Sequence, residues 1–446
     1  MGDAEAYRRV TLSDTAHDAL DIFLQALDAT RVAAAMERRL TCTAGVMVVD
    51  GHGYVLSDYR KLMLVSIGKA AGTMTNAFLH IVRDNAARMQ GVIAGVCEEQ
   101  LPEHLQIFAG GHPGPNQASL DAAAAILRLL EQADERDLVV FLVSGGGSSM
   151  VEQMLRGDIS LEDTAATHKA LVESGAPIAA INAVRKHLSA VKGGRLAAAA
   201  APAQQLTIFV SDVPIGELDA LASGPTLPDR STVADVRRIV AEYQLTARVP
   251  PAVADLLGSQ MAETPKPGGA IFAKSQWTVL LDSASLEEAA SSRAADLGWN
   301  VTIDNTCDDW DAEDAAKYLV QRLVELRRRR HRVCLLSAGE VTVRVPASAS
   351  GHGGRNQHFA LMCSQQIAGS DFVVLSAGSD GVDGNSSAAG AIANATTVAR
   401  AAAADYPVER ALAGFDSHAL LSMLGDAIVT GPTGNNLRDL RILLAP

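Results

Sequence analysis

The chain has 446 residues, of which 48% are hydrophobic and 20% charged, a composition typical of a globular protein with two or three domains. Its formal net charge of −13 argues against binding to nucleic acid or to anionic membranes, because both require basic surfaces. Five scattered cysteines without a CxxC pair, a first segment without a signal-peptide core and the lack of a bilayer-length apolar run predict a cytoplasmic protein.

The first part of the chain alternates apolar runs with amphipathic segments. Residues 14–40 predict one long helix, because apolar side chains recur there at helical spacing. The apolar run at residues 62–67 predicts a strand that leads into Gly68 and Lys69. Lys69 could present a compact positive charge to a phosphate or carboxylate, or it could be an ordinary surface lysine.

An uninterrupted apolar run at residues 138–143 predicts a strand buried on both faces, as in a parallel sheet between helices. Glycines allow close backbone approach, and serines can cap a following helix, so the loop after this strand predicts a phosphate site. A turn that is merely rich in glycine is the alternative. The residues of this loop are Ser144, Gly145, Gly146, Gly147, Ser148 and Ser149.

The next segments bring basic and acidic candidates. Arg185, on a helix predicted at residues 178–188, and Lys192 could bind an anionic substrate, or they could lie on a solvated helix face. A strand at residues 205–210 ends just before Asp212. The composition changes at residues 250–270, which predicts an N-terminal domain at 1–250 and a C-terminal domain at 270–446.

In the C-terminal part, the predicted strands at 333–337 and 371–375 run into Glu340 and Asp380. Arg355 stands at a predicted helix start after several glycines, where a guanidinium beside free N–H groups would suit an anion. An ion pair with a neighbouring acid is the alternative. Asp212 and Asp380 are candidate Mg²⁺ ligands because both follow strand ends, although aspartate is also common in turns.

Strands that alternate with helices predict parallel sheets with helices on both faces. In such sheets ligands bind at the carboxyl ends of the strands. The loops after the five predicted strands therefore predict one site, or two sites that face each other across a cleft. These loops carry Lys69, residues 144–149, Asp212, Glu340 and Asp380. The sequence contains no GxxxxGK[ST], no GxGxxG, no HExxH and no GxSxG motif.

Several ordered motifs resemble glycerate 2-kinases of the MOFRL type, a family whose members have also been labelled hydroxypyruvate reductase. The resemblance spans nearly the whole chain. Its motifs lie at residues 110–116, 144–149, 182–189, 192–195, 211–214, 222–226, 353–357 and 379–384. The sequence departs from the family pattern at Glu217, at His358 and at residues 385–387.

The resemblance implies two α/β domains, the first Rossmann-like and the second smaller, with the active site in the cleft between them. It implies ATP-dependent phosphorylation of D-glycerate to 2-phosphoglycerate with Mg²⁺. Lys69, Arg355 and Asp212 are the expected catalytic residues, and residues 144–149 are expected to bind the nucleotide. Lys69, Arg185, Lys192 and Arg355 are expected to bind substrate, and Asp212 and Asp380 to hold the metal.

Two other functions remain open at this point. An NAD(P)H-dependent hydroxypyruvate reductase is disfavoured by the missing GxGxxG motif. A non-catalytic anion-binding protein would use the same loops without turnover. The expected partners are therefore small molecules, ATP and glycerate, without nucleic acid or membrane, and a homodimer is a further expectation.

Overall fold

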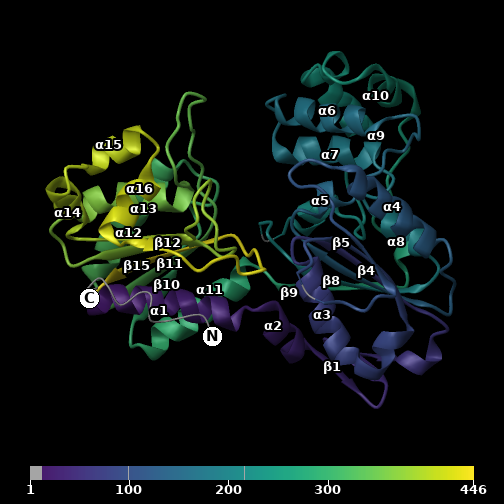
Figure 1. Cartoon of the computed structure of the whole chain (residues 1–446), viewed down its shortest axis with the longest axis horizontal. Helices are drawn as coiled ribbons and strands as arrows, with labels where there is room; N and C mark the ends of the chain where they lie inside the picture. The colour runs from purple at the N-terminus through teal and green to yellow at the C-terminus, as the bar shows by residue number, and fades with distance from the viewer. Residues whose placement is uncertain (1–12, 99, 215) are drawn as a thin grey trace. The chain divides into compact units, whose positions relative to one another are not determined.

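The computed structural model describes residues 13–98, 100–214 and 216–446, and the chain divides into two compact units (Figure 1). The first unit is Val32–Leu280, and the second joins the chain up to Arg31 to Leu281–Pro446. The boundary follows β9 (Ser275–Leu281), which still lies in the sheet of the first unit, so it comes later than residues 250–270. Residues 1–12, on which the expectation of no signal peptide rests, lie outside the described part.

The first unit contains a six-stranded sheet in the order β6-β5-β4-β7-β8-β9. The first five of these strands are parallel, and every residue of β4 and β7 is buried. This sheet confirms the predicted Rossmann-like architecture. The five strands are β6 (Leu105–Phe108), β5 (Met89–Gly95), β4 (Leu62–Gly68), β7 (Leu138–Ser144) and β8 (Gln204–Val210).

Helices cover both faces of this sheet. Helices α4 (Gln117–Leu130) and α8 (Arg195–Ala200) share an apolar core with one face. Helix α3 (Ala71–Val82) packs against β4, β5 and β7 on the other face. A second apolar cluster lies among α6 (Leu161–Val172), α7 (Ile178–Leu188), α9 (Val233–Glu242) and α10 (Pro251–Asp255), at the top of the unit in Figure 1.

Residues 14–40 form two helices, α1 (Asp14–Ala29) and α2 (Val32–Arg39), where the sequence predicted one. The hydroxyl of Thr30 donates to the carbonyl of Ala26 at 2.8 Å and helps to end α1, and the chain then enters the other unit. An antiparallel sheet that the sequence did not predict follows α2. Its strands are β1 (Leu40–Thr43), β2 (Val46–Val49) and β3 (His52–Val55).

The second unit contains a mixed six-stranded sheet, and the prediction of a parallel sheet in this domain is wrong. Its order is β10-β11-β15-β12-β13-β14, and only β10 and β11 pair in parallel. The last strand lies antiparallel between β11 and β12, and its seven residues are all buried. The strands are β10 (Asn300–Ile303), β11 (Val333–Gly339), β15 (Asp439–Ala445), β12 (Val373–Gly378), β13 (Gly390–Asn394) and β14 (Ala427–Ile428).

The central strands of this sheet still bring their loops to one edge. Strands β11 and β12 are both antiparallel to β15, so they run in the same direction on either side of it. Asp439, the first residue of β15, stands opposite Gly339 at the end of β11 and Gly378 at the end of β12. The loops after β11 and β12 and the start of β15 therefore share an edge.

Helices cover both faces of the second sheet as well. Helices α12 (Ala312–Arg327) and α13 (Arg355–Ile367) pack on one face, and α1 and α11 (Ser283–Asp296) pack together on the other. Helices α14 (Thr397–Ala403), α15 (Val408–Ala413) and α16 (Ser417–Leu424) share an apolar cluster with α13 and β13.

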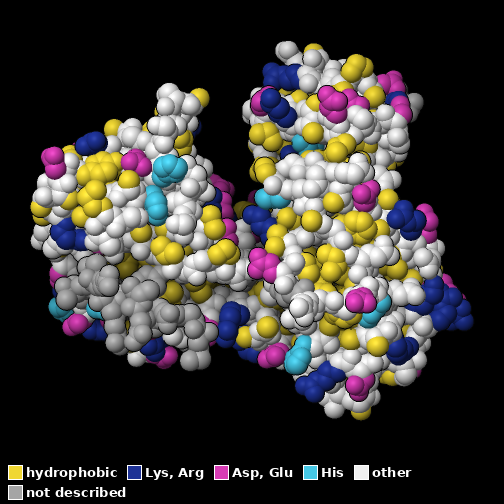
Figure 2. Space-filling model, viewed as in Figure 1, with side chains coloured by type: hydrophobic (Ala, Val, Ile, Leu, Met, Phe, Trp, Pro, Cys, Tyr) yellow, Lys and Arg dark blue, Asp and Glu magenta, His cyan; other side chains and the backbone are white. Residues whose placement is uncertain are grey.

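Acidic and basic side chains are interspersed on the viewed face of each unit (Figure 2). Among the described residues, no helix combines the length and the apolarity that a membrane span requires.

Candidate active site

Two predicted loops meet at the carboxyl edge of the first sheet. Because β4 and β7 are adjacent and parallel, the segment after Gly68 lies beside the segment after Ser144. The amide of Lys69 donates to the carbonyl of Gly145 at 2.8 Å, and the amide of Ala70 donates to the Ser144 hydroxyl at 3.0 Å. These hydrogen bonds hold the two loops together as one rigid rim.

Close packing explains why this rim needs glycine. Gly68 has a φ of +116°, and a Cβ there would overlap the backbone of Ser144. A Cβ on Gly145 would overlap the carboxylate of Asp212, which follows β8. The structure therefore brings Lys69, residues 144–149 and Asp212 together, as their positions at strand ends predict.

The helix expected after the glycines is short. Helix α5 (Gly147–Met150) has four residues and begins after Gly146, whose φ is +79°. The helix is too short to have a substantial dipole, so the loop amides themselves are the groups of this rim that could contact an anion. The amides of Gly145 and Gly146 donate to no acceptor among the described residues.

Lys69 supplies the positive charge of the rim. Its side chain is exposed, and within the described part of the chain it forms no ion pair. A Cβ on Gly146 would lie 3.1 Å from Cγ of Lys69, so the side chain extends along the glycine loop. A free ammonium group beside unpartnered amides fits an anionic ligand such as a phosphate group.

His112 joins this rim from the segment before α4, a residue to which the sequence assigned no role. Its Nδ1 atom lies 3.2 Å from the Ser149 hydroxyl. Partial burial of the ring, and then the charge of Lys69, lower the pKa of His112 below its ordinary value, although the residue as a whole is exposed. The signal in the sequence was the segment 110–116, in which Gly110 packs on the backbone of Met150.

A segment with strained backbone, residues 222–223, packs against the other side of the glycine loop. Ala222 and Ser223 have φ values of +48° and +60°, which are costly for residues that carry a Cβ. The hydroxyls of Ser223 and Ser148 lie 2.9 Å apart, and a Cβ on Gly147 would be 2.9 Å from the Cβ of Ala222. The glycine loop is thus packed from both sides.

Lys192 lies beneath the loop and is paired with an acid. It is 1% exposed, and its Nζ atom lies 2.6 Å from Oε2 of Glu152. Glu152 also accepts hydrogen bonds from the Ser189 hydroxyl at 2.7 Å and from His168 at 3.1 Å. Burial alone would raise the pKa of Glu152, but Lys192 and His168 lower it to about 2.

Arg185 lies beside this buried pair, with its Nε atom buried and without a hydrogen-bond partner among the described residues. Burial lowers the pKa of Arg185, and the negative charge of Glu152 opposes this shift without cancelling it. The direct binding of substrate by Arg185 and Lys192 stays a prediction, because the structure groups both with Glu152.

In the second unit, Arg355 forms ion pairs with acidic side chains, which was the alternative to an anion-binding role in the sequence analysis. Its guanidinium donates to Asp439 at 2.5 and 3.1 Å and lies 2.8 Å from Glu340. Asp439 and Glu340 raise the pKa of Arg355 despite its burial. The sequence did not indicate Asp439, because Arg441 interrupts the apolar pattern of the strand that carries it.

The expectation of free N–H groups at the start of α13 is wrong. Asp383, which is 2% exposed, accepts from the amides of Asn356 at 3.0 Å and Gln357 at 2.9 Å. An internal carboxylate therefore occupies the position where the sequence predicted an external anion. Burial raises the pKa of Asp383, although these hydrogen bonds oppose the shift.

Asp380 begins a turn after β12 and accepts from the amide of Val382 at 3.1 Å. Asp212 and Asp380 belong to different units, so neither unit by itself contains the predicted pair of metal ligands. Over residues 13–98, 100–214 and 216–446, no group of three or more metal-binding side chains is assembled. Asp212 lies beside a rim that fits a phosphate group. Its carboxylate therefore fits Mg²⁺, which commonly binds one or two carboxylates together with phosphate oxygens and water.

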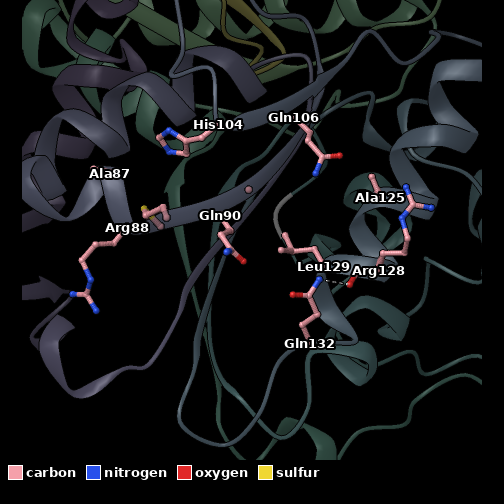
Figure 3. A pocket seen from close by; sticks show the side chains of 11 residues that line it. Ala87, Arg88, Gln90, His104, Gln106, Ala125, Arg128, Leu129 and Gln132 are labelled. Atoms are coloured by element: carbon pink, nitrogen blue, oxygen red, sulfur yellow. Dashed lines mark hydrogen bonds between the residues drawn. The ribbon is translucent and has the colours of Figure 1, made fainter.

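A cavity of about 620 Å³ lies elsewhere in the first unit (Figure 3). Its lining includes Gln90 and Gly91 at the start of β5, His104 before β6, and Arg128 and Gln132 near the end of α4. These residues are at the amino ends of the strands, opposite the edge that carries Lys69 and Ser144. Ligands of parallel sheets bind at the carboxyl ends, so we assign the candidate site to the rim.

Comparisons with known proteins agree with this architecture. Residues 18–258 match a family described as a domain of unknown function, DUF4147, and residues 333–439 match the MOFRL family. The chain is 34% identical to the D-glycerate 2-kinase of Thermotoga maritima, over 86% of this chain and 90% of that protein. It is 33% identical to a protein of Agrobacterium vitis named "Putative hydroxypyruvate reductase", over 86% of this chain and 99% of that protein.

A solved structure resembles the whole chain. The crystal structure of a glycerate kinase from Thermotoga maritima superposes with a TM-score of 0.83 at 31% sequence identity. The similarity covers 96% of this chain and 99% of that one. Both units described above therefore have counterparts in one solved protein.

Proposed function

This chain, which joins a DUF4147 domain to a MOFRL domain, belongs to the glycerate 2-kinase family, and from this premise we propose that it phosphorylates D-glycerate. The proposed reaction transfers the γ-phosphoryl group of ATP to the C2 hydroxyl and yields 2-phosphoglycerate and ADP. The observation that carries the proposal is the similarity to a D-glycerate 2-kinase over nine-tenths of that protein's length.

The proposed nucleotide site is the glycine rim of the first unit. The amides of Gly145 and Gly146 would donate to phosphate oxygens, and Lys69 would neutralise the charge of the transferred group. Phosphoryl transfer depends mainly on positioning and electrostatic stabilisation, which a rigid rim with a free ammonium group can supply.

The proposed metal is Mg²⁺, with Asp212 as its ligand in the first unit and Asp380 as the candidate in the second. When bound, Mg²⁺ would neutralise phosphate charge and orient the phosphoryl group for in-line transfer. The carboxylate of Asp212 is supported in this role by its contact with Gly145, which places it beside the loop amides.

Arg355 is the proposed second catalytic cation and a ligand of the glycerate carboxylate. Its ion pairs with Asp439 and Glu340 fix the guanidinium, while more than a third of its side chain stays exposed. Arg185 and Lys192 are retained as proposed substrate ligands.

The test is a measurement of ADP release by the purified protein with Mg²⁺-ATP and D-glycerate, with L-glycerate and glycerate-free reactions as controls. We expect ADP release that depends on both D-glycerate and Mg²⁺. The absence of glycerate-dependent ADP release would contradict the proposal.

A reductase is the second candidate because relatives such as the Agrobacterium vitis protein carry that name. The same preparation with hydroxypyruvate and NADH or NADPH tests it through loss of nicotinamide absorbance. Binding of ATP or glycerate without either turnover would instead indicate a non-catalytic anion-binding protein. A cytoplasmic location and a homodimer stay predictions, the second of which light scattering after gel filtration would test.

A further inference from the structure

His112 is a titratable group of the rim to which the proposed function assigns no role. It lies in the segment between β6 and α4, and its ring reaches the glycine loop that follows β7. A Cβ on Gly146 would lie 3.4 Å from Nδ1 of His112 and 3.1 Å from Cγ of Lys69. The imidazole and the lysine side chain therefore lie on either side of the same glycine.

The contacts of the Ser149 hydroxyl favour one tautomer of the neutral His112 ring. The Ser149 hydroxyl donates its single hydrogen to the carbonyl of Gly146 at 3.2 Å. With the hydroxyl hydrogen on that carbonyl, Nδ1 of His112, which lies 3.2 Å from the same oxygen, is the donor of their hydrogen bond. In the neutral imidazole this leaves Nε2 as a lone-pair acceptor.

The Nε2 atom of His112 is available to a ligand. The side chain is exposed, and across the described residues no partner contacts this nitrogen. The charged group that acts on the ring is Lys69, which favours the neutral imidazole, and the Asp212 carboxylate lies further along the loop against Gly145. An anionic phosphate oxygen would be repelled by a lone pair at Nε2, whereas a hydroxyl group could donate to it.

The other histidines near this edge cannot take that role. His168 is bonded to Glu152 at 3.1 Å, and its side chain is 11% exposed. His187 is fully buried, and its Nδ1 contacts the carbonyl of Ala183 at 2.9 Å. Only His112, of these three, combines an Nδ1 atom beside a hydroxyl group with an accessible Nε2 atom near Lys69.

We propose that Nε2 of His112 accepts the proton of the hydroxyl group that is phosphorylated, which makes His112 a catalytic residue. The hydroxyl oxygen forms a bond to the γ-phosphorus of ATP, and the bond from that phosphorus to the bridging oxygen breaks, so that ADP leaves with the electron pair. The O–H bond breaks, the proton passes to Nε2, and the resulting imidazolium returns it to water. This inference rests on the proposed glycerate kinase function.

The decisive variant is His112→Asn. Asparagine can still donate to the Ser149 hydroxyl from near the position of Nδ1, but it has no group at the position of Nε2. We expect kcat to fall about a hundredfold or more, with little change in the KM for ATP, as for the loss of a general base. The matched control is His104→Asn, which alters an exposed histidine at the opposite edge of the sheet and should retain wild-type kcat (Figure 3).

The pH profile of kcat distinguishes a proton acceptor from a residue that only supports the loop, because only the loss of a proton acceptor would change the profile. In the wild-type and His104→Asn proteins, kcat should fall as the pH drops through the pKa of His112, because protonation removes the acceptor. That acidic limb should be absent from His112→Asn. Ser149→Ala, which keeps the imidazole but loosens it, should lose less activity than His112→Asn and should keep the limb.

Three outcomes are informative. A wild-type protein without glycerate-dependent ADP release would refute the proposed function itself, whatever the variants do. An active wild type with a His112→Asn variant of equal kcat and an unchanged pH profile would overturn the role of His112. A variant whose only defect is a raised KM for ATP would also overturn it, because His112 would then bind phosphate instead of accepting a proton.

Discussion

At the residue scale, the structure separates charges that are available to a ligand from charges that are already paired. Lys69 has no ion-pair partner within the described part of the chain, whereas Lys192 is buried against Glu152, and Arg355 is held by Asp439 and Glu340. The sequence could not distinguish these cases, because Glu152 lies 40 residues from Lys192 and Asp439 lies 84 residues from Arg355 along the chain. Position after a strand end was enough to bring Lys69 and Asp212 to the rim.

The pair of Lys192 and Glu152 predicts a large stability effect. Replacing Lys192 with Met leaves the buried Glu152 carboxylate without its cation and should reduce the free energy of unfolding by about 3–5 kcal/mol. The double variant with Glu152→Gln should recover part of that loss. Urea unfolding of the single and double variants measures both, and an unchanged midpoint for Lys192→Met would contradict the account.

The same pair predicts a pH dependence of stability. The pKa of Glu152 is about 2 in the folded chain against an ordinary value of 4.5, so the unfolded chain binds more protons between these values. The stabilisation is therefore complete above about pH 4.5 and is lost as the pH falls toward 2. In urea titrations over this range, the wild type should lose more stability than the Glu152→Gln variant.

Arg355 predicts a change in both activity and stability. Substitution by Ala should lower kcat/KM by about a hundredfold or more, because a cation that stabilises the transferred phosphoryl group is lost. It should also lower the melting temperature, since Asp439, which is 2% exposed, loses its bidentate partner. Arg355→Lys should restore more of the lost stability than of the lost activity. Near-full turnover by Arg355→Ala would refute the catalytic role of Arg355.

At the element scale, the strands that lead into the first site were predictable, and the last strand was not. Continuous apolar runs identify β4, β7 and β8, and their carboxyl ends meet because the strands are parallel. Arg441 interrupts the apolar pattern of β15, although it is buried within the sheet. The missed strand explains why the second sheet was expected to be parallel and why Asp439 was not recognised.

The glycine rim predicts a local steric effect. A methyl group at Gly145 would overlap the Asp212 carboxylate, so Gly145→Ala should displace the loop or the aspartate and raise the KM for ATP at least about tenfold. Gly157→Ala is the matched control, because a Cβ there meets no atom within 4 Å. Equal ATP kinetics for the two variants would show that the rim does not bind the nucleotide.

At the scale of the whole molecule, the chain begins in one unit, forms the other and then returns. Helix α1 buries Phe23 and neighbouring apolar residues against the second sheet, and Asp18 accepts from the indole of Trp299 at 2.9 Å. The sequence assigned this helix to the N-terminal domain, because proximity along the chain is the only available guide when a helix can pack on either of two apolar cores.

This crossing predicts which unit loses stability when α1 is damaged. Phe23→Ala should cost about 3–5 kcal/mol, as for other buried aromatic truncations. Hydrogen exchange should accelerate in β12 and β15 while β4 and β7 remain protected. Faster exchange in β4 and β7 alone would contradict the assignment of α1 to the second unit.

Phosphorylation of D-glycerate at C2 is tested most directly by coupling the product of the reaction to enolase. Reactions with Mg²⁺-ATP and D-glycerate would be followed for phosphoenolpyruvate, with and without phosphoglycerate mutase. We predict immediate enolase turnover without the mutase, because 2-phosphoglycerate is the enolase substrate. ADP release with turnover only after mutase is added would mean phosphorylation at C3 and would contradict the claim.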